Sequence, residues 1–260
     1  MRRDKMEQNE RELIQLEGRN PIAEALAAGR SINKVYILQS ARRSHADAAL
    51  ARLAADCKEN GAVVTYVTRA VLDSMAATGA HQGIIAEAAP YQYTDLQEIL
   101  LRCERQNKSP FLILLDHIQD AYNLGSILRI ADGAGVDAVI IPQRRSVSLN
   151  AAVAKASAGA VEHVPICRVV NLSKTVLDLK DAGFWVYGSA ANGKTAYDQA
   201  NYSGKIALIV GSEGDGISDK LLAHCDFLLT IPLRGKVNSL NAAVAAGIIT
   251  FEAARQRGIS

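Results

Sequence analysis

The stretch KIALIVGSEGDGISDKLLAHCDFLLTIPLRGKVNSLNAAVAAG, residues 205–247, indicates the fold class most clearly. Its apolar run Ile206–Val210 ends at Gly211 and is typical of a strand buried in a parallel sheet. The loop GSEGDG follows, and glycine has no Cβ to keep a ligand away from the backbone. A second strand, Phe227–Leu233, leads through a polar turn to an Ala-rich helix. Because ligands of open α/β sheets bind at the carboxyl ends of strands, the stretch also predicts a binding site.

The order of the glycines argues against two common nucleotide-binding motifs. GSEGDG has Gly-x-x-Gly-x-Gly order, whereas a dinucleotide-binding turn has G-x-G-x-x-G order. No Lys-Ser or Lys-Thr pair follows the loop, as it does in a phosphate-binding P-loop. For this loop taken alone, plain turn glycines with nothing bound are the alternative interpretation.

Composition favours an α/β protein of one large domain or two smaller ones. The chain has 260 residues, of which 49% are hydrophobic and only 5% aromatic. Glycine or charge interrupts its apolar runs before they reach the length of a membrane span, and no apolar secretory segment follows the first residues. The cysteines are scattered and the histidines lack metal-ligand spacing. We therefore expect free thiols in a reducing cytoplasm, no membrane contact and no metal.

Alternation of helices and strands divides the chain into parts. Residues 1–13 predict a flexible arm, and residues 14–90 a small α/β domain. Residues 91–109 predict a linker that carries one helix. From 110 to 260, apolar strands alternate with helices, which predicts a mostly parallel sheet covered on both faces. The expected strands lie at 34–38, 63–67, 83–88, 111–115, 138–141, 164–169, 184–188, 206–210 and 227–233.

Several polar residues interrupt this apolar framework. Arg129 lies among apolar residues of an expected helix, where it needs an anionic or hydrogen-bonding partner unless its stem carries the charge to solvent. Glu213 of the glycine loop is a candidate partner or a solvated carboxylate. Asn238, Ser239 and Asn241 precede the last helix and exceed what one N-cap needs, which favours a site.

Charge along the chain is balanced, with 29 basic and 27 acidic residues, so any contact with nucleic acid must be a local patch. Arginines in loops or at helix ends are the candidates because they can reach phosphates. Each of them taken alone has solvated surface as the simpler interpretation. The candidates for RNA binding are Arg19, Arg30, Arg42, Arg43, Arg144 and Arg145.

Three ordered motifs resemble those of the SpoU/TrmH branch of the SPOUT RNA methyltransferases. The front part of the chain, from Glu17 to Gly83, is similar to the small substrate-binding domain of many members. Among these, the chain most resembles enzymes that methylate the ribose 2′-oxygen of a guanosine in 23S ribosomal RNA; an rRNA adenosine and a tRNA guanosine are the alternatives. The motifs are Asn123-x-Gly-x-x-x-Arg129, Ile209-Val-Gly-Ser-Glu213-Gly-x-Gly and Ile231-Pro-Leu-x-Gly-x-Val-x-Ser239-Leu-Asn241.

The resemblance implies a deep trefoil knot in the C-terminal domain, a homodimer through that domain, and S-adenosylmethionine bound in the knot. One departure is the opening of the first motif, Asp120-Ala-Tyr-Asn123, where Asp-Pro-x-Asn is commoner. The implied cofactor-binding residues are Gly188, Ser189, Gly211, Ile231, Leu233 and Leu240. The implied catalytic residues are Arg129, Asn123, Glu213, Ser239 and Asn241.

The chemistry of ribose methylation agrees with this set. The 2′-hydroxyl is a weak nucleophile that must lose its proton as it attacks the methyl group. Because a guanidinium hardly deprotonates, we expect Arg129 to stabilise the developing alkoxide and a neighbouring phosphate, and the proton acceptor stays open. A non-catalytic RNA-binding protein of the same fold and a Rossmann-type nucleotide-dependent enzyme are the alternatives of other classes.

Overall fold

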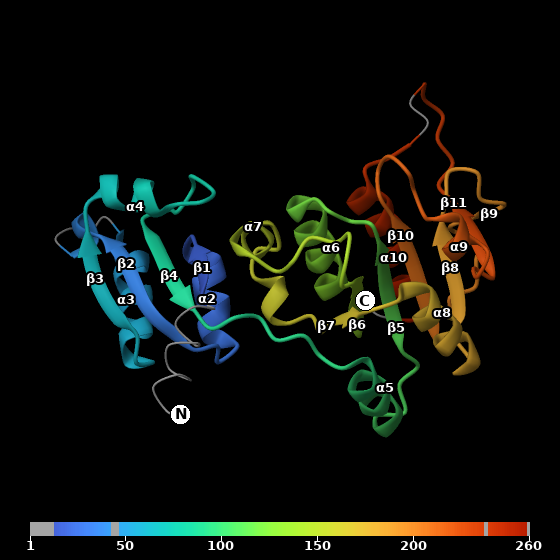
Figure 1. The fold of residues 1–260 in the computed structure, drawn as a ribbon, viewed down its shortest axis with the longest axis horizontal. Coiled ribbons are helices and arrows are strands. Elements are labelled where there is room, and N and C mark those ends of the chain that lie inside the picture. The colour runs from blue at the N-terminus through green and yellow to red at the C-terminus, as the bar shows by residue number, and fades with distance from the viewer. Residues whose placement is uncertain (1–12, 43–46, 237–238, 259–260) are drawn as a thin grey trace. The chain divides into compact units, whose positions relative to one another are not determined.

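The structure, a computed structural model, describes residues 13–42, 47–236 and 239–258 (Figure 1). It forms two compact units. The first comprises the chain up to Gln92 together with Leu149–His163, and the second comprises Tyr93–Ser148 and the chain from Val164 onward. The expected flexible arm, 1–13, lies almost entirely outside the described residues.

The described part of the first unit contains a four-stranded sheet of order β1-β4-β2-β3. Strand β2 is parallel to β3 and antiparallel to β4, and β4 is antiparallel to β1. The sequence did not predict β1, because four residues are too few to show a periodic pattern. The elements are β1 (Ile14–Glu17), α2 (Arg19–Ala27), β2 (Ile32–Leu38), η1 (Gln39–Arg42), α3 (Ala48–Glu59), β3 (Val63–Val67), α4 (Arg69–Met75), β4 (Ile84–Ala88), α7 (Ala151–Ala156) and η3 (Ala160–Glu162).

The segment 149–163, which the sequence analysis placed in the C-terminal domain, packs with the first unit, where α7 contacts β1 and α2. A buried ion pair holds it, since Arg30 Nη1 lies 2.8 Å from Glu162 Oε1 and both side chains are less than a tenth exposed. Gly159 lies against α2 at a backbone φ of +97°, and a Cβ there would approach Glu24 Cγ to 2.2 Å. Residues of the first unit that lie far away in the sequence therefore position this segment.

The described part of the second unit contains a seven-stranded sheet of order β7-β6-β5-β10-β8-β11-β9 in which neighbouring strands are parallel. The mostly parallel sheet that the sequence predicted is confirmed. The strands are β5 (Phe111–Asp116), β6 (Ala138–Pro142), β7 (Ile166–Val169), β8 (Trp185–Ser189), β9 (Thr195–Ala196), β10 (Ile206–Gly211) and β11 (Phe227–Thr230). The helices are α5 (Leu96–Arg105), α6 (Ala121–Gly133), α8 (Leu172–Asp181), α9 (Asp219–Leu222) and α10 (Ala242–Gln256).

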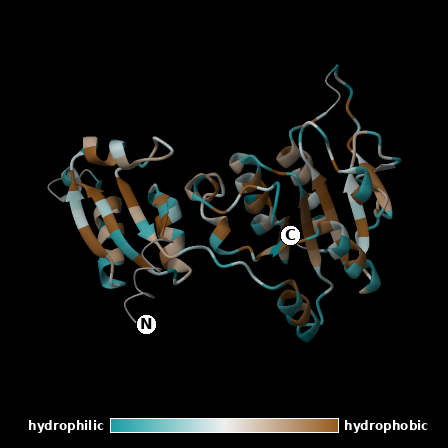
Figure 2. Cartoon of the chain, in the orientation of Figure 1, coloured by the Kyte–Doolittle hydropathy of each residue, from teal (hydrophilic) through white to brown (hydrophobic). Residues whose placement is uncertain are grey.

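Helices cover both faces of this sheet. On one face, α5, α8 and α9 share a buried cluster with β5, β6, β8 and β10, and on the other α10 packs against α6 and β10. The central strands β5 and β10 are buried along their whole length, and Figure 2 shows the strands of the sheet as mostly hydrophobic. This burial on both faces explains the continuous apolar runs in the sequence.

One boundary differs from the prediction near the end of the chain. The expected strand Phe227–Leu233 ends at Thr230, just before Ile231-Pro232, where proline lacks the N–H that would continue the ladder. The last helix begins at Ala242, directly after its N-cap, Asn241. Among the described residues, no helix is long and apolar enough to cross a membrane.

Candidate active site

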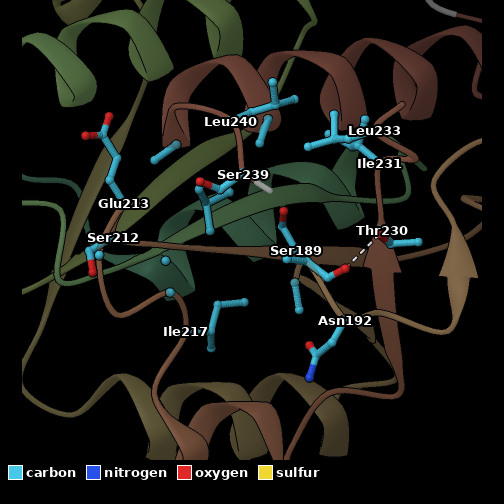
Figure 3. Close-up of a pocket in the computed structure, with 18 of the residues that line it drawn as sticks. Ser189, Asn192, Ser212, Glu213, Ile217, Thr230, Ile231, Leu233, Ser239 and Leu240 are labelled. Atoms are coloured by element: carbon cyan, nitrogen blue, oxygen red, sulfur yellow. Dashed lines mark hydrogen bonds between the residues drawn. The ribbon is translucent and has the colours of Figure 1, made fainter. Parts of the chain in front are cut away.

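A cavity of about 640 Å³ opens at the carboxyl edge of β8, β10 and β11 (Figure 3). Three loops line it, one after each of these strands, together with the start of α10. Its volume is within the roughly 300–1,000 Å³ of ordinary ligand pockets. The sequence predicted a site at this edge of the sheet, and the structure provides a cavity there.

Both apolar and polar side chains line the cavity. Figure 3 shows Ile231, Leu233 and Leu240 in the upper part of the view, and Ser189 and Asn192 below them. Ser189 is the last residue of β8, and Asn192 lies in the loop that follows it. That loop is fixed to the next strand, because Thr230 Oγ1 donates a hydrogen bond to the carbonyl oxygen of Ala191 at 3.2 Å.

The glycine loop after β10 folds back on itself. Ser212 and Gly216 exchange backbone hydrogen bonds of 3.1 and 3.0 Å. A Cβ on Gly211 would lie 2.1 Å from the carbonyl carbon of Gly216, so any larger residue would push this turn away. The sequence suggested that this glycine permits close approach of a ligand. In the structure the loop's own backbone fills the space beside Gly211, which still lines the cavity.

Five of the six expected cofactor-binding residues line the cavity: Ser189, Gly211, Ile231, Leu233 and Leu240. Gly188 is not among the lining residues. A Cβ there would lie 2.8 Å from Cys225 Sγ and 3.1 Å from Leu228, so this glycine permits close packing beneath the site. Asn192 and Thr230 also line the cavity and were not predicted from the sequence. Their position directly after β8 and at the end of β11 was the available signal.

Three expected catalytic side chains meet at one carboxylate oxygen. Glu213 Oε1 accepts a hydrogen bond from Asn123 Nδ2 at 3.1 Å and another from Asn241 Nδ2. Asn241 Nδ2 also lies 2.9 Å from Asn123 Oδ1. Among the residues that the structure describes, Glu213 Oε2 has no hydrogen-bond partner. One oxygen of the carboxylate thus fixes the network and the other stays open to a ligand.

The same asparagines are held by the helices on which they lie. Asn241 Oδ1 accepts hydrogen bonds from the backbone N–H groups of Ala243 and Val244, at 3.0 and 3.2 Å, and caps α10. Asp120 caps α6 and accepts from the backbone N–H of Asn123 at 3.0 Å. Aspartate therefore starts the helix of the first motif, in which alanine replaces the commoner proline.

Arg129 does not join this network. Asn123 lies in the first turn of α6, so the two side chains project in directions about 120° apart around the helix axis. Arg129 is exposed and, within the described part of the chain, has no hydrogen bond or ion pair, with Glu213 or any other residue. Ser239 is exposed and lines the cavity. Asn238 lies outside the described residues.

The candidate RNA-binding arginines differ in their exposure and in whether they pair with a carboxylate. The prediction that Arg30 binds RNA has to be corrected. Its guanidinium is buried, pairs with Glu162 and lies 3.7 Å from the ring centre of Tyr91, so it cannot reach a phosphate. Arg19, at the start of α2, pairs with Asp47 and is about a third exposed. Arg144 and Arg145 are exposed. The side chain of Arg42 and the whole of Arg43 lie outside the described residues.

The cysteines are free thiols, as expected, and three of the four are buried. Burial raises the pKa of the Cys225 thiol, beneath the cavity, to about 11, and Asp226 adds to the shift. A thiol with so high a pKa is a poor nucleophile at neutral pH. Among the described residues, no group of three or more His, Cys, Asp or Glu side chains is placed to hold a metal ion.

Fold and site together define an α/β protein with a cofactor-sized cavity and an amide–carboxylate network at the strand ends. Residues 110–251 match the model of the SpoU rRNA Methylase family, and residues 15–94 match the domain described as RNA 2'-O ribose methyltransferase substrate binding. The chain therefore belongs to the SpoU rRNA methylase family.

Known proteins agree with this assignment. The chain is 40% identical, over 92% of its length and 94% of the relative's, to the "Putative TrmH family tRNA/rRNA methyltransferase YacO" of Bacillus subtilis. It resembles the AdoMet-bound rRNA methyltransferase of Sinorhizobium meliloti, with a TM-score of 0.75 and 25% identity over 96% of this chain and 90% of that one. The fold is shared with the SpoU methyltransferase AviRb of Streptomyces viridochromogenes, with a TM-score of 0.77 and 22% identity over 95% of this chain and 91% of that one.

The protein is an S-adenosylmethionine-dependent RNA methyltransferase, as its family membership shows. This confirms the class that the three motifs predicted. It also sets aside both alternatives from other classes, the non-catalytic RNA-binding protein and the Rossmann-type nucleotide-dependent enzyme.

Proposed function

We propose that the protein methylates the ribose 2′-oxygen of a guanosine in 23S ribosomal RNA. The observation that carries the proposal is the network of Asn123, Glu213 and Asn241 beside the cavity. The match of residues 15–94 to a substrate-binding domain of ribose 2′-O-methyltransferases supports the position of the methyl group. The guanosine and the 23S RNA rest on the sequence resemblance.

The cavity suits S-adenosylmethionine. Ile231, Leu233 and Leu240 provide an apolar wall for the adenine ring, while Ser189 and Asn192 offer polar groups to its edge or to the ribose and amino-acid parts. When bound, the cofactor supplies an electrophilic methyl group on a positively charged sulfonium.

The protein's own groups then orient and activate the ribose. Glu213 is held at Oε1 by two amides, and its Oε2 can accept a hydrogen bond from a ribose hydroxyl. Arg129 is exposed and without a partner in the described structure, so it is available to bind a phosphate and to stabilise the alkoxide. Positioning of donor and acceptor supplies on the order of 7–11 kcal/mol in favourable cases.

The assembly expected from the resemblance belongs to the same proposal. The chain around the three loops of the cavity forms a trefoil knot, and two copies pair through the C-terminal unit. Support for pairing comes from α10, on which Val244 and Phe251 are each 51% exposed although both are apolar. The protein acts in the cytoplasm under this proposal, because its substrate is ribosomal RNA and its thiols are free and mostly buried.

The test is methyl transfer to unmodified transcripts of 23S rRNA and of tRNAs, with isotope-labelled S-adenosylmethionine. A 2′-O-methyl group protects the adjacent phosphodiester from alkaline cleavage, so the modified nucleotide can be mapped. We expect one protected bond, at a guanosine of the 23S transcript. Protection at an adenosine, or in tRNA only, would overturn the proposed substrate, and base methylation without protection would overturn the ribose as the target.

A further inference from the structure

A second series of polar contacts begins at the buried end of β5, outside the residues that line the cavity. Asp116 is 4% exposed, and its Oδ2 accepts a hydrogen bond from the backbone N–H of Ser218 at 2.8 Å. Its other oxygen, Oδ1, lies 2.7 Å from His117 Nδ1. Because an ionised carboxylate only accepts hydrogen bonds, His117 Nδ1 carries a proton and donates it to this bond.

The far nitrogen of His117 faces an arginine. Arg145 Nη1 lies 3.4 Å from His117 Nε2. A guanidinium only donates, so in the neutral ring Nε2 is the acceptor, which agrees with the proton on Nδ1. The contact is long, and the remaining N–H groups of Arg145 have no partner among the described residues. Asp116 and His117 thus orient a guanidinium whose donors stay free.

Both residues of this contact have strained backbones. His117 and Arg145 each have a φ of +59°, a left-handed conformation that non-glycine residues rarely adopt. Their loops are tied together, since the backbone N–H of Val147 donates to the carbonyl oxygen of Ile118 at 3.1 Å. Strain at two residues that meet each other indicates a function for the contact.

The location connects this contact to the active site. Asp116 is paired in register with Gly211, the first residue of the glycine loop that carries Glu213, and Ser218 lies just beyond that loop. The loop after His117 leads directly to Asp120, the cap of the helix that carries Asn123. Through His117, Asp116 therefore links the guanidinium of Arg145 to the glycine loop that carries Glu213 and to the segment that leads to Asn123.

We propose that Arg145, oriented by Asp116 and His117, binds a phosphate of the RNA strand next to the nucleotide that is methylated. The inference rests on the proposed function and adds the residue that anchors the backbone of the substrate. A guanidinium suits the role because its planar fork matches two phosphate oxygens. Asp116 and His117 are positioning residues. Arg144 is exposed and has no partner in the described structure, so it adds only diffuse charge.

The experiment compares Arg145→Ala, Arg145→Lys, His117→Asn and the matched control Arg144→Ala. Asparagine tolerates the left-handed backbone and can still donate to Asp116, but it leaves Arg145 without its acceptor. For each variant, steady-state methyl transfer to the 23S transcript gives kcat and KM. Filter binding of the same transcript over a range of KCl concentrations gives the salt slope, calorimetry the S-adenosylmethionine affinity, and thermal unfolding a check of the fold.

For Arg145→Ala we expect a KM for RNA raised about tenfold, a largely unchanged kcat and cofactor affinity, and a salt slope lower by about 0.7. Arg145→Lys should recover the salt slope but only part of the KM, since a lysine is a point charge. His117→Asn should raise KM about threefold with an unchanged melting temperature, and Arg144→Ala should change KM less than Arg145→Ala.

Two results would overturn the inference: equal effects of Arg144→Ala and Arg145→Ala, or wild-type KM in His117→Asn. Failure of the proposed function looks different. If the wild-type protein transfers no methyl group to ribose, the salt slope and affinity of transcript binding still decide whether Arg145 binds phosphate. A loss of affinity in Arg145→Ala then upholds the phosphate site, and its absence refutes it.

Discussion

The side-chain amide of Asn123 lies 3.1 Å from Glu213 Oε1, ninety residues further along the chain. Asn241 donates to the same oxygen and, with its own Oδ1, caps α10. Three segments that are distant in sequence therefore share one carboxylate oxygen. Because Asn241 belongs to both the network and the cap, the geometry of the site is coupled to the start of α10.

Two substitutions at position 241 distinguish the contact with Glu213 from the cap of α10. Serine at position 241 still caps α10 but is too short to reach Glu213, whereas alanine does neither. We expect both Asn241→Ser and Asn241→Ala to lose most methyl transfer. Only the alanine variant should lose stability, by about 1 kcal/mol. Turnover and thermal unfolding of the pair provide the measurement, and a serine variant as active as the wild type would show that the network is dispensable.

Arg129 should be needed for the reaction and not for cofactor binding. Its side chain is exposed and does not line the cavity, so Arg129→Ala leaves the cofactor site intact. We expect methyl transfer to be abolished, with S-adenosylmethionine affinity by calorimetry and the free energy of unfolding close to wild type. Near wild-type turnover on unmodified rRNA would rule out the role given to Arg129.

The dimer prediction can be directed at one face of α10. Val244 and Phe251 are seven residues apart, which places them on one side of the helix, and each is half exposed. We expect light scattering to report a dimer at micromolar concentration, and a monomer for Val244→Asp combined with Phe251→Asp. A wild-type monomer at that concentration would refute the assembly, and a dimeric double variant would place its interface elsewhere.

Removal of residues 1–90 tests the division of labour between the units. We expect a folded, dimeric, cofactor-binding domain with weaker RNA binding, a smaller salt slope and inefficient methylation. The segment 149–163 loses the partners that cover it, including Arg30, and should become more sensitive to proteolysis. Equal methylation of rRNA by the truncated and full chains at equal salt would show that the first unit does not read the substrate.

Glu17 should make the stability of the first unit depend on acid. Burial alone would raise the pKa of its carboxyl, but hydrogen bonds from the hydroxyl and N–H of Thr78, the N–H of Ala77 and the amide of Gln15 outweigh it and lower the pKa below 4.5. A lowered folded-state pKa gives stability that is complete above the unfolded value and is lost as pH falls through the folded one.

We therefore expect the unfolding free energy to fall below about pH 4.5 in the wild type, and to fall less steeply in Glu17→Gln, which is less stable at neutral pH. Chemical denaturation at a series of pH values, followed with a probe in the first unit, measures this. The same acid slope in both proteins would show that the titration of Glu17 is not linked to folding.

Local stretches of the sequence were enough to predict the alternation of strands and helices, the site at the strand ends and the family. Runs such as Phe111–Leu115 and Ile206–Val210 are local, and their unbroken hydrophobicity follows from burial on both faces of a parallel sheet. The motifs also lie within short stretches, so Asn123, Glu213 and Asn241 could be named in advance although nothing in their spacing showed that they touch.

Which side chains meet could be seen only in the folded protein, because such contacts join residues far apart in the chain. Arg30 could be taken for a phosphate ligand until Glu162, 132 residues away, was found against it. Gly211 accommodates the backbone of Gly216 and Gly188 the sulfur of Cys225, while the sequence shows only that both are glycines. Arg144 and Arg145 are identical neighbours in sequence. The buried carboxylate of Asp116, acting through His117, distinguishes them, because it orients one guanidinium and leaves the other in solvent.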